Sequence, residues 1–170
     1  KKAIKINPNF DSALFCIGNM LLTEEKYKES VKYFNKAIRS NPNCSVFHIL
    51  KADALINLKK TERALDCFKE VIKIDPNDNT AYNTIGSFLL AKNRYEEAIN
   101  YFNEAIRIDP NCADFYKNKA RALTALGQNE ESLECFNKIL ELYPNDDNVY
   151  SDLGLILFND EKYEEAINYW

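Results

Sequence analysis

Two basic residues, Lys117 and Arg121, stand out among the few side chains that could support chemistry. They are four residues apart, so on a helix both side chains would lie on the same face. Neighbouring cations of this kind can bind the carboxylate of a partner. Alternatively the pair is simply solvated, with Asp114 nearby. We therefore treat Lys117 and Arg121 as a candidate contact for an acidic partner.

Side chains that could catalyse a reaction are scarce. His48 is the single histidine, which excludes metal sites built on a histidine pair, and we interpret it as a packing residue with a pH-sensitive contact as the alternative. Glu130 and Glu131 are expected in a solvated turn or outer face, not as a catalytic acid and base. Glycine-rich phosphate-binding motifs are missing. The sequence therefore predicts no enzyme, no cofactor and no metal site.

The five cysteines are an odd number and include no C-x-x-C pair. Their spacing suits neither a zinc site nor a small disulfide framework. The interval from Cys44 to Cys112 equals that from Cys67 to Cys135, which indicates inheritance with a repeated unit. We expect reduced thiols that pack as small apolar residues, in a reducing compartment such as the cytoplasm.

The composition limits the class of partner. With 46% hydrophobic and 28% charged residues, the chain has the composition of a folded globular protein. No long apolar run predicts a membrane span, so we expect no membrane partner. A net charge of -4 with interspersed Lys and Glu argues against nucleic acid. A protein or peptide segment is the expected partner.

A 34-residue period organises the chain. The columns at this interval are Pro8, Pro42, Pro76, Pro110 and Pro144; Leu21, Leu55, Leu89, Leu123 and Leu157; and Phe34, Phe68, Phe102, Phe136 and Trp170. Each proline is followed by Asn. Proline ends one helix, and either this Asn or a polar residue just beyond it, such as Asp11 or Asn79, can cap the next.

Apolar residues within one period follow two helical patterns. They are Ala81, Tyr82, Ile85, Phe88 and Leu89, then Tyr95, Ala98, Ile99, Phe102, Ala105 and Ile106. A short polar turn between them predicts an antiparallel hairpin. Gly86 and Ala98 would let the two helix backbones approach closely. Each period therefore predicts one pair of helices.

A second, 68-residue period overlies the first, and we interpret it as duplication of a two-repeat block. The sequence KADALINLKKTERALDCF resembles KARALTALGQNEESLECF one such interval later. Both ends are out of phase with the repeat, so the chain is expected to be a window from a longer protein. We predict one array over residues 1–170: the tail of a preceding repeat at 1–10, full repeats at 11–44, 45–78, 79–112 and 113–146, and a truncated repeat at 147–170.

The columns of Gly or Ala, Tyr, Ala, Phe and Pro resemble the tetratricopeptide repeat (TPR), a 34-residue helix-turn-helix unit, over the whole chain. The place of its first-helix Trp is held instead by Leu14, His48, Tyr82, Tyr116 and Tyr150. The resemblance implies an all-α fold, a right-handed α-solenoid of stacked antiparallel helix pairs. It also implies a concave groove along the first helices that holds an extended segment of a partner.

On this resemblance the partner-binding groove comprises Phe15, Asn19, Val46, Ile49, Asp53, Asn83, Ser87, Lys117 and Arg121. The groove is expected to be apolar near its start, small and polar mid-way, and basic near Lys117 and Arg121. Phe15 and Ile49 are the better candidates for a ligand pocket. For the nearby apolar residues Leu22, Ile56 and Phe158, packing between repeats is the alternative.

Two specialisations of the family do not fit. Chaperone-binding members grip a C-terminal dicarboxylate tail with basic residues, and none of the three matching frames here presents the required basic pair. The Asn ladder of the sugar-transferring members is also missing, since its places read Cys16, Leu50, Thr84, Asn118 and Asp152.

The predicted function is a non-catalytic protein-interaction scaffold, with a large multi-protein complex as one setting. Two alternatives stay open: a substrate-recruiting arm of a larger enzyme, and a structural spacer in a cytoskeletal or ciliary assembly. Sequence beyond the two ends of the chain would distinguish the enzyme arm from the others.

Overall fold

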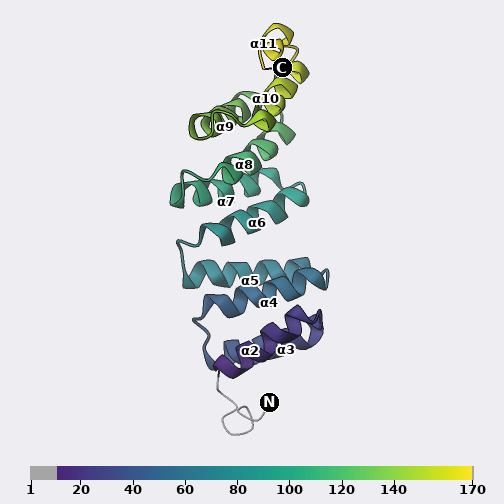
Figure 1. Cartoon of the computed structure of the whole chain (residues 1–170), viewed down its shortest axis with the longest axis vertical. Coiled ribbons are helices and arrows are strands. Elements are labelled where there is room, and N and C mark those ends of the chain that lie inside the picture. Colours follow the sequence, from purple (N-terminus) through teal and green to yellow (C-terminus); the bar gives the residue numbers. More distant parts are fainter. Residues whose placement is uncertain (1–10, 170) are drawn as a thin grey trace. The chain divides into compact units, whose positions relative to one another are not determined.

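The computed structural model describes residues 11–169, which form ten α-helices. In chain order they are α2 (Asp11–Thr23), α3 (Tyr27–Ser40), α4 (Ser45–Asn57), α5 (Thr61–Ile74), α6 (Asn79–Ala91), α7 (Tyr95–Ile108), α8 (Ala113–Ala125), α9 (Asn129–Leu142), α10 (Asp147–Asn159) and α11 (Tyr163–Ile167). Within each unit, successive helices are antiparallel and joined by short turns (Figure 1). The predicted all-α fold of antiparallel helix pairs is confirmed. The expectations for residues 1–10 and for Trp170 lie outside the described residues.

The chain divides into two compact units, residues 1–81 and 82–170. In the first unit, α2 packs on α3, α3 on α4, and α4 on α5. In the second unit, α7 packs on α8, α8 on α9, and α10 on both α9 and α11. Most of α6 belongs to the second unit. We call α2, α4, α6, α8 and α10 the first helices and their partners the second helices.

Two glycines make room for a buried aromatic ring of the neighbouring helix in the pair. A Cβ atom placed on Gly18 would lie 2.8 Å from Cε1 of Phe34, and one on Gly86 would lie 2.6 Å from Cε1 of Phe102. Both rings are fully buried, so each ring fills the space that a glycine leaves open. At Gly86 this ring is Phe102, and the predicted close approach of the two backbones stays a prediction.

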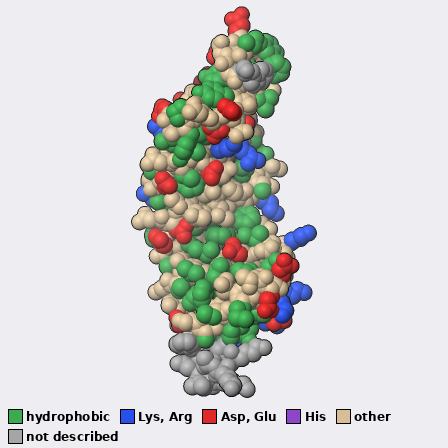
Figure 2. Space-filling view, viewed as in Figure 1, with side chains coloured by type: hydrophobic (Ala, Val, Ile, Leu, Met, Phe, Trp, Pro, Cys, Tyr) green, Lys and Arg blue, Asp and Glu red, His purple; other side chains and the backbone are tan. Residues whose placement is uncertain are grey.

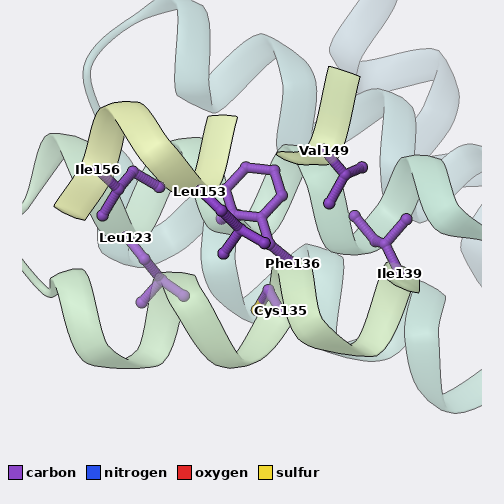
Figure 3. Packing of buried hydrophobic residues seen from close by; sticks show 8 residues of the cluster. Leu123, Cys135, Phe136, Ile139, Val149, Leu153 and Ile156 are labelled. Carbon is purple, nitrogen blue, oxygen red and sulfur yellow. The ribbon is translucent and has the colours of Figure 1, made fainter. Parts of the chain in front are cut away.

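The aromatic column supplies the centre of the core in the second unit. Phe136 and Ile139 of α9 lie against Val149 and Leu153 of α10 (Figure 3). None of these four side chains is more than 3% exposed. Burial of a large apolar side chain stabilises the fold by about 1.5–3 kcal/mol. This packing fixes α8, α9 and α10 together and thereby positions the outer faces of α8 and α10.

Every first helix ends in the same left-handed turn. The residue in the left-handed conformation has φ of 59°, 57°, 58°, 75° and 62° in the five turns, at Glu25, Lys59, Asn93, Gly127 and Glu161. After α8, the Gln128 N–H donates to the Leu123 carbonyl and the Gly127 N–H donates to the Thr124 carbonyl, each over 3.0 Å. This pair of bonds is the Schellman motif, so the leucine column also marks the helix end.

At the proline boundaries, one of the two predicted arrangements for capping the next helix is wrong. Second helices end two residues before each proline of residues 11–169, but the Asn after the proline does not cap the next helix. The cap is the residue beyond the Asn, which before α6 is Asp78 and not the expected Asn79, the first residue of that helix. Asp78 accepts a bond of 2.8 Å from the Ala81 N–H, and Asp146 accepts one of 3.1 Å from the Asn148 N–H. Cys44 and Cys112 occupy the same place without a side-chain cap bond.

Candidate functional site

The first helices of the second unit carry two adjacent hollows. The Lys117 hollow, of about 590 Å³, lies between α8 and α10, and its lining includes Lys117, Arg121, Phe136, Asp152, Leu155 and Ile156. The Arg121 hollow, of about 470 Å³, lies between α6 and α8, and its lining includes Ser87, Leu90, Tyr95, Asn118, Arg121 and Ala125. Arg121 and Ala125 line both hollows. The first-helix face of this unit is therefore recessed on both sides of Arg121.

Lys117 and Arg121 differ in whether an acidic side chain of the same unit pairs with them. Lys117 Nζ lies 3.8 Å from Asp152 Oδ2, with side chains 41% and 40% exposed, so this ion pair is weak. The Arg121 side chain is exposed and forms no ion pair or hydrogen bond with any other residue between 11 and 169. Figure 2 shows acidic and basic side chains close together on the second unit. The Arg121 guanidinium is therefore available to an acidic group of a partner.

Asn83 and Ser87 lie on the same face as the basic pair. Asn118 Nδ2 donates to Asn83 Oδ1 over 3.0 Å, a partly buried bond that joins α8 to α6. Ser87 lines the Arg121 hollow. The structure thus places the four candidate residues of this unit on adjoining first helices, with Asn83 already engaged within the chain.

A hollow also lies on the first helices of the first unit. The Asp53 hollow, of about 310 Å³, lies between α2 and α4 and is lined by Leu22, Tyr27, Asp53, Ile56 and Asn57. The half-buried Asp53 carboxylate has no ion pair or hydrogen bond with the residues that the structure describes. Burial raises the pKa of this carboxyl above its ordinary value, because the charged form loses hydration. The aliphatic side chains of Leu22 and Ile56 thus line the same hollow as an unpaired acid.

The other four candidate residues of the first unit do not line this hollow. Phe15 is half-buried, and its ring centroid lies 5.7 Å from that of Phe47 in the core. Ile49 is half-buried, Asn19 is exposed and Val46 is 45% exposed. Much of the Phe15 ring therefore contributes to packing.

Sequence reasoning missed several residues that line the hollows. Tyr27 and Tyr95 begin second helices yet border hollows between first helices. They hold the same place in successive copies of the 68-residue block, a signal that could have found them. Asp152 was also missed as the partner of Lys117, and the spacing of these two residues offered no signal.

The other side chains that could support chemistry, which are the histidine, the cysteines and the acids, are buried or lie apart from one another. His48 is 8% exposed, and burial lowers its pKa below the ordinary value. All five cysteines are free, and burial raises the pKa of the Cys67 and Cys135 thiols. Residues 11–169 contain no group of three or more His, Cys, Asp or Glu side chains that could hold a metal ion. In the same range, no helix is both long enough and apolar enough to cross a membrane.

Two protein-family models match the chain. One is described as a tetratricopeptide repeat and matches residues 89–156. The other, the N-terminal TPR repeats region of psidin, matches residues 20–119, more than half of the chain. The chain belongs to the tetratricopeptide repeat family. Among curated protein sequences, none matches it.

Solved structures of other TPR proteins share the fold. The crystal structure of MamA has a TM-score of 0.85 at 19% identity, over 94% of this chain and 87% of that one. YrrB, described as a TPR protein with an unusual peptide-binding site, has a TM-score of 0.82 at 17% identity, over 99% and 87%. PilF of Pseudomonas aeruginosa has a TM-score of 0.73 at 21% identity, over 94% and 72%. At these identities the likeness establishes the TPR fold alone.

Proposed function

We propose that this TPR chain is a non-catalytic scaffold that binds an extended segment of a partner protein along its first helices. The observation that carries the proposal is the position of Arg121, an exposed cation between two hollows with partly apolar walls. A recess that combines apolar contacts with a few polar groups suits the binding of a peptide segment. The description of YrrB, which shares the fold, supports a peptide as the ligand.

The residues of each unit favour different partner chemistry. Lys117 and Arg121 favour acidic or polar side chains at the second unit, while Leu155 of the Lys117 hollow offers an apolar contact. Val46 and Ile49 offer apolar anchoring at the first unit. The missing basic pair argues against a C-terminal dicarboxylate chaperone tail, and the net charge of -4 argues against nucleic acid.

We also propose how the repeats are organised and where the chain acts. We propose that the five periods form one array with the repeat boundaries given above. Its place of action is a reducing compartment such as the cytoplasm, since all five cysteines are free. A large multi-protein complex is one setting in which such a scaffold acts.

Capture of partners by groove variants tests the proposal. Wild-type chain, Ile49→Glu, and a double variant with Lys117→Glu and Arg121→Glu are immobilised and exposed to one cell extract, and bound proteins are quantified by mass spectrometry. The control is Arg107→Glu with Lys138→Glu, which makes the same change of charge as the double variant, on exposed residues of the second helices α7 and α9. We expect both groove variants to lose partners that the control retains, with equal helical content by circular dichroism. Equal recovery by all four proteins would contradict the proposal.

A further inference from the structure

The Asp53 hollow and the Arg121 hollow occupy equivalent places in the two 68-residue blocks. Leu22, Tyr27, Asp53 and Asn57 line the first, and their counterparts one block later, Leu90, Tyr95, Arg121 and Ala125, line the second. Each hollow is therefore formed by the same positions of two successive repeats. A hollow therefore recurs with the 68-residue period.

Two wall residues are the same in both hollows, whereas the charge is inverted. Each has a leucine from the end of one first helix and a tyrosine from the start of the following second helix. The position between them carries a carboxylate in one hollow, Asp53, and a guanidinium in the other, Arg121. The hollows differ in volume, about 310 and 470 Å³, but both offer the leucine and the tyrosine as apolar contacts. The charged residue then decides which side chain each hollow favours.

Neither charge is balanced within its own unit. The Asp53 carboxylate and the Arg121 guanidinium have no ion pair or hydrogen bond with any residue in the described range, whereas Asp152 on the same face of α10 pairs with Lys117. Partial burial of the Asp53 carboxylate without a cation is unfavourable, and an incoming cation would relieve it. The long aliphatic stem of Lys or Arg would contact Leu22 and Ile56 while its charged head reaches the carboxylate.

We infer that the two hollows select partner side chains of opposite charge: the Asp53 hollow takes Lys or Arg, and the Arg121 hollow takes Asp or Glu. This inference rests on the proposed function, because it assigns side chains of a bound protein segment. The Arg121 guanidinium presents its donors as a planar fork that matches a carboxylate. Asn118, which also lines that hollow, offers a further polar contact.

Peptide selection with reversal of charge tests the inference. A phage-displayed library of random peptides is selected against the wild-type chain, Asp53→Asn, Asp53→Lys, Arg121→Gln and Arg121→Glu. Asp66→Asn, an exposed acid on the second helix α5, is the matched control. Peptides dependent on the Asp53 hollow should carry Lys or Arg, bind Asp53→Asn about tenfold more weakly, and bind the control as tightly as wild type. Changing that basic residue to Glu should restore binding to Asp53→Lys. Peptides dependent on the Arg121 hollow should carry Asp or Glu and bind Arg121→Gln more weakly. Changing that acidic residue to Lys should restore binding to Arg121→Glu.

The outcomes separate this inference from the proposed function. If the wild-type chain enriches no peptide, or if Ile49→Glu and the Lys117→Glu and Arg121→Glu double variant bind every enriched peptide unchanged, both are overturned. If peptides bind and these groove variants weaken them, the proposed function holds. In that case, if reversing the charge of a hollow does not change the charge of the selected peptides, the side chain assigned to that hollow is wrong. Circular dichroism confirms that each variant keeps its helical content, and the isosteric Asp53→Asn change tests the charge if Asp53→Lys fails to fold.

Discussion

His48 Nε2 lies 3.2 Å from the carbonyl oxygen of Pro42, six residues earlier in the chain. Because a carbonyl oxygen only accepts, Nε2 must carry the proton of this bond. The hydroxyl groups of Tyr116 and Tyr150 donate in the same way to prolines six residues before them, over 3.1 and 3.0 Å. The same hydrogen bond therefore closes three repeat boundaries, with His in place of Tyr in one of them.

Acidification should weaken the fold through His48. Burial lowers the pKa of His48 in the folded chain and outweighs the hydrogen bond to the Pro42 carbonyl, which raises it. Lys51 lowers the pKa and Glu70 raises it to a lesser extent. The unfolded chain, with an ordinary pKa of 6.5, therefore binds a proton that the folded chain resists. The free energy of unfolding should fall as the pH drops below about 6.5, until the folded-state pKa is passed. Urea unfolding between pH 8 and 5, followed by circular dichroism, measures this fall.

His48→Tyr is the matched variant for this prediction, because Tyr holds the same place at residues 116 and 150. Tyr stays neutral over this pH range and can donate to the Pro42 carbonyl, so the variant should be less sensitive to pH than wild type. His48→Phe removes both the titration and the bond, and should cost about 1 kcal/mol at pH 8 relative to His48→Tyr. A pH dependence in His48→Tyr as steep as that of wild type would contradict the assignment.

Gly86→Ala should destabilise the α6–α7 pair despite the better helix propensity of alanine. The new Cβ would lie 2.6 Å from Cε1 of Phe102, whose ring is fully buried and has little room to move. Overpacking of this kind lowers the free energy of unfolding by about 1–3 kcal/mol, as chemical denaturation would measure.

A double-mutant cycle with Phe102→Leu separates this clash from other effects of Gly86→Ala. The smaller leucine leaves space for the new methyl group, so the two changes together should cost about 0.5–3 kcal/mol less than the sum of the single changes. Simple additivity of the two costs would show that the ring is not what excludes a side chain at Gly86.

The left-handed turn residue offers a reciprocal exchange between two repeats. Lys59 has φ of 57°, a conformation that costs a residue with a side chain about 1–2 kcal/mol, whereas glycine adopts it readily. Lys59→Gly should therefore raise the free energy of unfolding by up to about 1 kcal/mol. Gly127→Lys, at φ of 75°, should lower it by a similar amount. Thermal or urea unfolding measures both, and a loss of stability in Lys59→Gly would refute the argument.

The periodic residues revealed the helix pairs because a buried face must recur with the helix. Gly86 and Phe102 occupy columns of the 34-residue period, and the structure packs one against the other. The left-handed conformation at Lys59 and Glu161 was not predictable from residue type, because such residues disfavour it. It is imposed by the Schellman hydrogen bonds and by the closely packed hairpin.

The candidate site was predictable in part, because its positions also recur with the repeat. The columns identified the positions of Asp53, Ser87, Lys117 and Arg121, all of which line hollows. A column does not show where a side chain ends, so the recurrence of Tyr27 as Tyr95 marked a shared position but not its place beside a hollow between first helices. Nor does spacing alone show whether an ionised side chain has a partner, which depends on contacts between repeats.

A better cap at the start of α8 should stabilise the second unit. Cys112 precedes the helix with φ of -87° and ψ of 107°, close to the -86° and 93° of Asp146 before α10. Asp146 caps its helix with a side-chain bond, whereas Cys112 makes none. Cys112→Asp supplies both a hydrogen-bond acceptor and a negative charge at the helix N-terminus, and should raise the free energy of unfolding by about 1 kcal/mol. Asp146→Cys should lower it by a similar amount, and Cys112→Ala controls for loss of the thiol. Equal urea-unfolding midpoints for Cys112→Asp and Cys112→Ala would show that the backbone before α8 does not accept a side-chain cap.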